Sequence, residues 1–286
     1  MLEFLNAASG EAIHWADLGL RPGIELGFFT LRYYSLAYLI GILLAYWHLS
    51  KMVKAPGAPM AQDHVEDLFF YCTLGVILGG RLGYATFYEP SLWSDPSALV
   101  AVWNGGMSFH GGLIGTVLAM AYVSWRGGLP FIRVADYVAV NVPFGMTLGR
   151  IANFINGELW GRPAGEGVPW AMVFPGGGPL ARHPSQLYEA ALEGLLMVII
   201  MLFLFWRTRA RFRTGLLVGV FVTGIALARF VVEFFRQPDA QLAEFAARSG
   251  LNMGQWLTIP LIILGIGLIV WSLNRKPIAS GDRPVS

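Results

Sequence analysis

Apolar stretches of about 20 residues recur along the whole chain, and this repetition constrains its fold more than any other feature. A helix needs about 20 residues to cross the hydrocarbon core of a bilayer. Only 13% of the 286 residues are charged, whereas an ordinary soluble domain has about 25%. A soluble protein of this size would also show polar helix faces around one buried core. The chain is therefore predicted to be an integral membrane protein.

The apolar stretches predict helices rather than barrel strands. Backbone groups in lipid must form hydrogen bonds with one another, and these stretches are too long and too uniformly apolar for strands. The predicted fold is all-α, a polytopic bundle that forms a single integral membrane domain over residues 1–286. Its seven transmembrane helices are expected at residues 28–48, 67–88, 106–124, 135–155, 186–206, 215–236 and 255–273.

The distribution of lysine and arginine predicts the orientation of the helices. Basic clusters follow the first, third, fifth and seventh predicted helices, and with seven helices all of them lie on one side. That side is the cytoplasm by the positive-inside rule. The N-terminus and the loops near 89–105, 156–185 and 237–254 are then periplasmic, and residues 275–286 form a cytoplasmic tail. The basic residues are Lys51, Lys54, Arg126, Arg133, Arg207, Arg209, Arg211, Arg213, Arg275 and Lys276.

Charge and cysteine content exclude several function classes. The formal net charge is +2, too small for nucleic-acid binding with basic residues so scattered. The single cysteine, Cys72, excludes an intramolecular disulfide and a multi-cysteine metal site. No metal ion or cofactor is predicted. The N-terminal segment has acidic residues and no basic region before an apolar stretch, so it does not read as a cleaved signal peptide.

Ionisable residues inside the predicted helices are the strongest sign of function, because each one costs about 2.5–3.5 kcal/mol to insert. A single arginine inside a helix could extend its side chain so that the guanidinium group reaches the lipid headgroups. In the predicted topology, however, five polar residues fall in the outer third of the membrane, which favours a shared polar cavity open to the outer leaflet. These residues are Tyr34, Arg81, His110, Arg150 and Arg229.

Helical spacing groups the polar residues further. In the segment GRIANFINGELWGRP, residues 149–163, Arg150, Asn153 and Gly157 have i, i+3, i+7 spacing and are expected on one helix face. Arg229 and Glu233 are four residues apart, close enough to form an ion pair. That pair either orients a functional guanidinium or only neutralises a buried charge. Glycines around Arg81 and His110 favour close helix packing.

The periplasmic segment 156–185 is rich in glycine and proline and longer than an ordinary connection. It could be a disordered linker. Several apolar residues in it argue instead for a loop that docks on the bundle or acts as a lid. These residues are Trp160, Trp170, Met172, Val173 and Phe174.

Guanidinium groups at headgroup depth suit the phosphate of a phospholipid. A lipid-processing enzyme is therefore one hypothesis, with His110 as a candidate base. A lipid or anionic-solute transporter is the alternative, but it predicts a polar route to the cytoplasmic side, where ionisable residues are sparser. An intramembrane hydrolase would need a nucleophile, and Ser108 lacks an evident orienting acid.

Four motifs together, HGGLIG, GRIANFINGELWGRP, HPSQLYEA and ARFVVEFFRQPD, closely resemble the bacterial prolipoprotein diacylglyceryl transferases. The resemblance runs from about Tyr33 to the last predicted helix. It implies a seven-helix enzyme of the inner membrane with its active site toward the periplasmic leaflet. Such enzymes move the diacylglyceryl group of phosphatidylglycerol to the lipobox cysteine of a prolipoprotein signal peptide, forming a thioether and releasing glycerol phosphate.

The resemblance also implies roles for individual residues. His110, Arg150 and Arg229 fall on catalytic positions. The substrate-binding positions that we predict are Tyr34, Arg81, Asn153, Glu158, Gly161 and Glu233. Two departures are visible: the chain reads YYS at 33–35 where WYG is common, and Ile225 stands where the family often has tyrosine.

Overall fold

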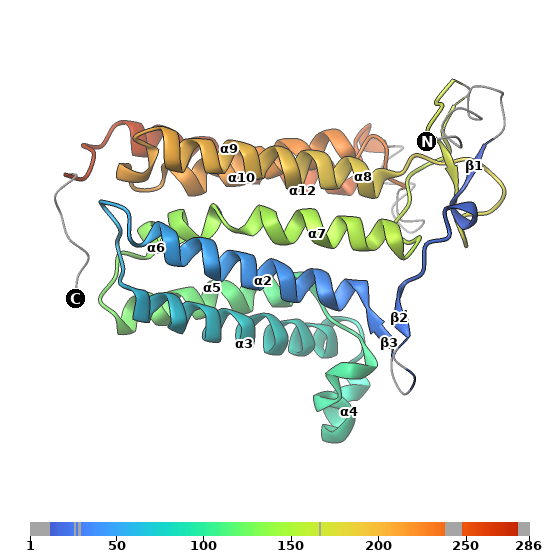
Figure 1. The fold of residues 1–286 in the computed structure, drawn as a ribbon, viewed down its shortest axis with the longest axis horizontal. Coiled ribbons are helices and arrows are strands. Elements are labelled where there is room, and N and C mark those ends of the chain that lie inside the picture. Colours follow the sequence, from blue (N-terminus) through green and yellow to red (C-terminus); the bar gives the residue numbers. More distant parts are fainter. Residues whose placement is uncertain (1–11, 26, 28–29, 166, 238–247, 280–286) are drawn as a thin grey trace. The chain divides into compact units, whose positions relative to one another are not determined.

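A computed structural model describes residues 12–25, 27, 30–165, 167–237 and 248–279 of the chain. The chain forms two compact units, of which the first comprises residues 1–45 and 139–276 and the second 46–138 and 277–286. Most of the described residues are helical, which confirms the predicted helical class (Figure 1). That the whole chain is one membrane domain stays a prediction.

The first unit is built from helices that lie side by side. Helices α10 and α12 pack along each other, and α7 contacts the helix that contains α8, η5 and α9 (Figure 1). The element η5 is one turn of π-helix between α8 and α9. The bounds are α2 Tyr33–Met52, whose last residues from 46 on belong to the second unit, α7 Val142–Ile155, α8 Ser185–Glu189, η5 Ala190–Leu195, α9 Leu196–Arg207, η6 Ala210–Phe212, α10 Leu216–Val232 and α12 Met253–Leu273.

The second unit is organised around the pair α3 and α5. Glycines of α3 face glycines of α5 so closely that a Cβ added to Gly79 would lie 2.3 Å from the Gly111 carbonyl oxygen. Small residues at such an interface let two helix backbones approach, which confirms the predicted packing role of these glycines. The bounds are α3 Gln62–Phe87, η3 Pro90–Ser94, α4 Pro96–Val100, η4 Val102–Asn104, α5 Phe109–Arg126 and α6 Phe131–Ala139.

Every predicted helix range overlaps a helix or a broken helix of the structure. Within the described residues, three helices are long and apolar enough to cross a membrane, or four if α6 and α7 form one broken span. These are Gln62–Phe87, Ser185–Arg207 and Met253–Leu273. The protein is therefore a membrane protein by the length and composition of its helices. The count of seven spans and the orientation of the termini stay predictions.

Two predicted helices begin or run differently in the structure. The first was expected from residue 28, but residues Thr30–Arg32 form strand β3, and α2 begins at Tyr33. The range 135–155 is divided into α6 and α7, with Pro143 in the first turn of α7. Proline has no backbone N–H to donate, so a helix tends to restart at that point rather than continue through it.

The long loop after α7 is folded rather than an open linker. Its strand β4 (Met172–Val173) pairs in parallel with β1 (Ile13–His14). Trp15, Met172 and Phe174 are buried together, and the Trp15 indole donates a hydrogen bond of 2.8 Å to the carbonyl oxygen of Phe154 at the end of α7. Met172 and Phe174 of this loop therefore pack against Trp15, whereas Trp170 is 49% exposed, and a lid role for the loop stays a prediction. Strand β2 (Gly23–Glu25) forms a separate antiparallel pair with β3.

Candidate functional site: an arginine cluster on buried carboxylates

Arg150 of α7 and Arg229 of α10 converge on one carboxylate. The Nε atom of Arg150 lies 3.0 Å from Glu189 Oε2, and Nη1 of Arg229 lies 2.9 Å from Glu189 Oε1. Arg236, just beyond α10, contacts the same Oε1 oxygen. Three guanidinium groups, one from α7 and two from α10 and the residues just beyond it, therefore share one counter-ion at the end of α8.

Two more carboxylates complete the cluster. Glu193 in η5 lies 3.5 Å from Nη2 of Arg150 and 3.8 Å from Nη1 of Arg229. Glu233 lies 3.1 Å from Nη2 of Arg229, which confirms the predicted ion pair at i, i+4 spacing. Three guanidinium and three carboxylate groups thus face one another, so their formal charges cancel.

The acidic side chains of this arginine cluster are more deeply buried than the arginine side chains. The side chains of Glu189, Glu193 and Glu233 are exposed by 0%, 2% and 8%. Those of Arg150 and Arg229 are exposed by 25% and 26%. The carboxylates therefore lie at the back of the cluster, and the arginines form its accessible side.

The accessible side keeps hydrogen-bond donors available. Among the described residues, neither Nη1 of Arg150 nor Nε of Arg229 forms a hydrogen bond. Guanidinium N–H groups match the charge and spacing of phosphate oxygens. The cluster can therefore bind an anion while its own carboxylates hold the arginines in place.

Asn153 and Glu158 lie beside the end of α7 and bind each other. The Asn153 amide donates to Glu158 Oε1 over 2.8 Å, and the Asn156 amide donates to the same oxygen over 3.1 Å. The buried amide of Gln186 donates to the Glu158 backbone carbonyl over 2.6 Å. The side chain of Glu158 is thus held by two amides and its backbone by a third.

Gly157 does not share a helix face with Arg150, so that prediction was wrong. Helix α7 ends at Ile155, and Gly157 follows with a φ of 67°. Glycine adopts such left-handed conformations without a steric penalty and commonly ends a helix in this way. The segment from residue 157 onward therefore leaves the helix direction.

Gly161 lies where two other segments leave no room for a side chain. A Cβ at this position would lie 2.3 Å from the Phe235 carbonyl oxygen and 2.7 Å from the carbonyl oxygen of His183. Its backbone N–H donates to His183 over 2.9 Å, and the next N–H, of Arg162, donates to Phe235 over 2.9 Å. Gly161 thus joins the loop to the chain just before Arg236.

His183 and Tyr188 form a small polar contact beside this junction. The Tyr188 hydroxyl lies 3.1 Å from His183 Nδ1 and accepts a hydrogen bond of 2.6 Å from the Trp170 indole. Burial, and to a lesser extent the positive charge of Arg162, lower the pKa of His183. The imidazole is therefore more easily kept neutral in the folded loop.

Tyr34 lies in the first turn of α2, with its hydroxyl 3.2 Å from that of Tyr38. The side chain is 38% exposed. Its hydroxyl can donate or accept one more hydrogen bond. Its predicted substrate contact stays a prediction.

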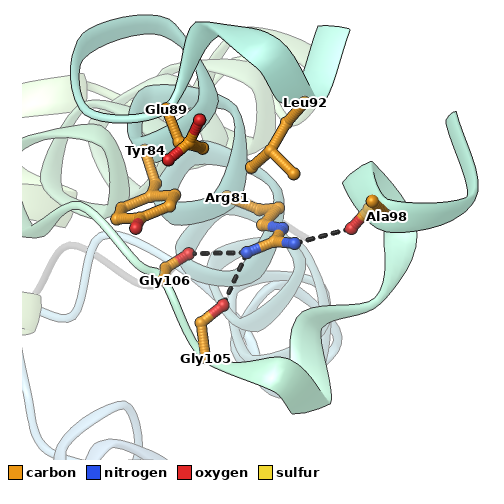
Figure 2. Close-up of a pocket in the computed structure, with 7 residues that line it drawn as sticks. All are labelled: Arg81, Tyr84, Glu89, Leu92, Ala98, Gly105 and Gly106. Carbon is orange, nitrogen blue, oxygen red and sulfur yellow. Dashed lines mark hydrogen bonds between the residues drawn. The ribbon is translucent and has the colours of Figure 1, made fainter. Parts of the chain in front are cut away.

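Arg81 belongs to the second unit and is bound to backbone. Figure 2 shows its guanidinium pointing toward the carbonyl oxygens of Ala98, Gly105 and Gly106. It donates four hydrogen bonds of 2.5–3.1 Å, to those three carbonyls and to that of Leu99. The residue is only 6% exposed, so its geometry supports a role in holding the 88–106 segment. Substrate binding by Arg81 stays a prediction.

His110 also belongs to the second unit, as the second residue of α5. Ser108 caps this helix by accepting a hydrogen bond of 3.2 Å from the Gly111 N–H. The His110 side chain is exposed, and its ring contacts that of Phe109 at 5.6 Å between centroids. Its imidazole is accessible for proton transfer, and its catalytic role stays a prediction.

The structure therefore brings together Arg150, Arg229 and Glu233, and separately pairs Asn153 with Glu158. No site role was predicted from the sequence for Glu189, Glu193 or Arg236. A signal for the two glutamates was available, because YEAALE places two carboxylates four residues apart inside an apolar helix. Charges in such a position call for partners.

The sequence of the chain is similar to those of known proteins over most of its length. The sequence profile of the family described as Prolipoprotein diacylglyceryl transferase matches residues 23–271. The chain is 63% identical to the phosphatidylglycerol–prolipoprotein diacylglyceryl transferase of Erythrobacter litoralis (strain HTCC2594), over 98% of this chain and 99% of the relative. It is 46% identical to the protein of the same name from Zymomonas mobilis, over 92% and 95% of the two chains. The corresponding protein of Gluconobacter oxydans is 47% identical, over 88% and 92%.

Proposed function

The chain belongs to the prolipoprotein diacylglyceryl transferase family, and we propose that it moves the diacylglyceryl group of phosphatidylglycerol to the lipobox cysteine of a prolipoprotein. It is a transferase of lipoprotein maturation and acts at the first step. The bond that forms is a thioether between the cysteine sulfur and a glycerol carbon. The bond that breaks joins that carbon to a phosphate oxygen, so glycerol phosphate leaves.

The arginine cluster is the observation that carries this proposal. Arg150 and Arg229 offer free N–H donors on the accessible side of a neutral, mostly buried network. They bind the lipid phosphate and stabilise the charge that grows on the departing phosphate oxygen. Donors already oriented toward that charge lower the barrier without reorganising during the reaction.

The attacking sulfur comes from the protein substrate. A free thiol has a pKa of about 8.5, and only the thiolate is a good nucleophile. His110 accepts the thiol proton in our scheme, because its imidazole is exposed and histidine is a common proton acceptor in catalysis. The proton finally neutralises one charge of the released phosphate monoester. Cys72 is intermediate in exposure and takes no part.

Four other predicted site residues orient either the lipid or the arginines that bind its phosphate. Glu233 holds the guanidinium of Arg229, and Asn153 and Glu158 form an amide–carboxylate pair beside Arg150. Tyr34 supplies a hydroxyl at the first turn of α2. We propose that the last three hydrogen-bond the glycerol headgroup.

We further propose seven spans in the bacterial inner membrane, with the N-terminus periplasmic and the C-terminus cytoplasmic. The basic residues after α9 and α12 support this orientation, since lysine and arginine favour the cytoplasmic side. Arg150 and Arg229 then face the periplasmic leaflet. The folded loop 157–184 lies on the same side and can act as a lid over the signal peptide.

The test is a reconstitution of the purified protein with phosphatidylglycerol and a lipobox peptide. A diacylglyceryl mass gain on the peptide, with equal release of glycerol phosphate, is the expected result. A peptide with serine in place of the cysteine and vesicles of phosphatidylethanolamine serve as controls. Transfer to the serine peptide, or none to the cysteine peptide with folded protein, would refute the proposal.

Site variants test the roles within the reaction. Arg150→Ala and Arg229→Ala each remove one phosphate ligand, and loss of an oriented donor of this kind lowers kcat by about 10²–10³-fold. Full activity of either variant would contradict the phosphate-binding role. His110→Asn tests the base separately, because it leaves the arginine cluster unchanged.

A further inference from the structure

Two buried glutamates, Glu189 and Glu193, have no role in the scheme above. We infer that Glu189 is a positioning residue that fixes the spacing of Arg150 and Arg229, with Glu193 as its helper, so that both guanidinium groups meet one phosphate. This inference deepens the proposed function and rests on it for the identity of the anion.

The contact geometry points to Glu189 as the centre of the arginine cluster. One of its oxygens pairs with Arg150 at 3.0 Å, and the other pairs with Arg229 at 2.9 Å and with Arg236. A single rigid carboxylate group thus joins α7 to α10. Glu193 repeats the same bridge at 3.5 and 3.8 Å.

Charge neutralisation alone does not explain this arrangement. Arg229 has Glu233 on its own helix, one turn away, as a counter-ion. Helix α7 contains no acidic residue, so Arg150 depends on carboxylates supplied by another helix. Glu189 is completely buried, which is an expensive position for a charge unless it is paired. Its burial and its contacts are those of a fixed bridge between two arginines.

Glu193 lies within the π-helical turn η5, and Glu189 directly precedes this turn. Such turns are rare and occur mostly as single bulges in α-helices, often at functional sites. Within η5, Gly194 lies against α7, where an added Cβ would be 2.5 Å from Thr147 Oγ1 and 2.7 Å from Thr147 Cα. Gly194 follows Glu193, and Thr147 is three residues before Arg150. The two helices therefore pack tightly at a position next to the ion pairs.

The consequence is a pre-formed phosphate site. Two neighbouring guanidinium groups repel each other, and Glu189 offsets this repulsion from the buried side. Both guanidinium groups stay partly exposed before any lipid arrives, because Glu189 and Glu193 hold them from the buried side. Displacing one of them by about 1 Å is enough to lower a rate by about 10²-fold.

Glu189→Gln is the first variant, because it keeps the shape of the side chain and removes its charge. We expect its kcat/KM for phosphatidylglycerol to fall by about 10²-fold, and its KM for the lipobox peptide to stay within about twofold of the wild type. A purely structural role would lower activity only through the folded fraction and would leave both KM values unchanged. Activity is therefore referred to the monodisperse, folded protein.

Asp136→Asn is the matched control. Asp136 is also completely buried, and its carboxylate lies 3.8 Å from an arginine, Arg133, in the second unit. We expect this control to change stability without changing either KM value. Should Glu189→Gln not fold, Glu193→Gln decides by the same criterion with an expected loss of about 10-fold, because its contacts are longer.

A second measurement, of ligand binding, does not depend on diacylglyceryl transfer. Glycerol phosphate should bind the folded wild type, as measured by its protection against thermal unfolding, and Glu189→Gln should weaken this binding by at least about 10-fold. Absence of lipid transfer by the wild type would refute the proposed function alone. Wild-type KM for phosphatidylglycerol and wild-type glycerol phosphate affinity in a folded glutamate variant would overturn the positioning role of the glutamates.

Discussion

Gly161→Ala is expected to disturb the arginine cluster without changing any residue of it. The added methyl group would lie 2.3 Å from the carbonyl oxygen of Phe235, whereas ordinary contacts begin at 3.4 Å. The segment must therefore move by about 1.1 Å, the difference between these two distances. Backbone of His183 blocks the other side at 2.7 Å, so the methyl group cannot turn away.

Phe235 precedes Arg236, which shares Glu189 with Arg150 and Arg229, the two arginines proposed to bind phosphate. Overpacking of this kind costs about 1–3 kcal/mol. A shift of about 1 Å can lower the rate by about 10²-fold. The assay is kcat/KM for diacylglyceryl transfer, with the melting temperature of the purified protein measured in parallel.

Gly165→Ala is the matched control in the same loop, because a Cβ there would meet nothing within 4 Å. We expect it to keep wild-type activity and melting temperature. If Gly161→Ala retained more than half of the wild-type kcat/KM and melted at the same temperature, the close approach to Phe235 would not govern the site. The reasoning from backbone contact would then be refuted.

Three further predictions concern other contacts. Gly254→Ala would place a Cβ 2.7 Å from the Glu233 carboxylate and should lower kcat/KM about 10-fold, whereas Gly267→Ala on the same helix, with open space around it, should not. Arg81→Lys should speed proteolysis between α3 and α5 because it loses carbonyl contacts; a raised KM for phosphatidylglycerol with unchanged proteolysis would instead support lipid binding. Because the folded-state pKa of His183 is lowered, its contribution to stability is present above about pH 6.5 and is lost as the pH falls. His183→Asn should therefore melt with a weaker dependence on pH between about 5 and 7.5.

Contacts between residues one helical turn apart could be predicted from the sequence. Arg229 and Glu233 are one helical turn apart, so their ion pair follows from spacing alone and is present in the structure. The apolar character of the helices likewise follows from composition. The relation of Arg150 to Gly157 was not predicted correctly, because the chain leaves α7 before Gly157 is reached.

The partners of the arginines could not be read in the same way. Glu189 and Glu193 are 39 and 43 residues away from Arg150 in the numbering, and only the packing of α7 against η5 brings them together. The role of Arg81 depends on the path of the 98–106 segment, whose carbonyls surround its guanidinium. No helical periodicity specifies either arrangement.

Residue type and local spacing are enough to make this protein helical and apolar and to supply arginines that suit a phosphate. The tertiary structure decided which of those arginines act together. It gathered Arg150 and Arg229 on Glu189 and turned Arg81 toward backbone carbonyls. The physical reason is that a buried charge is stable only beside a partner, and the partner is chosen by helix packing across long separations in the chain.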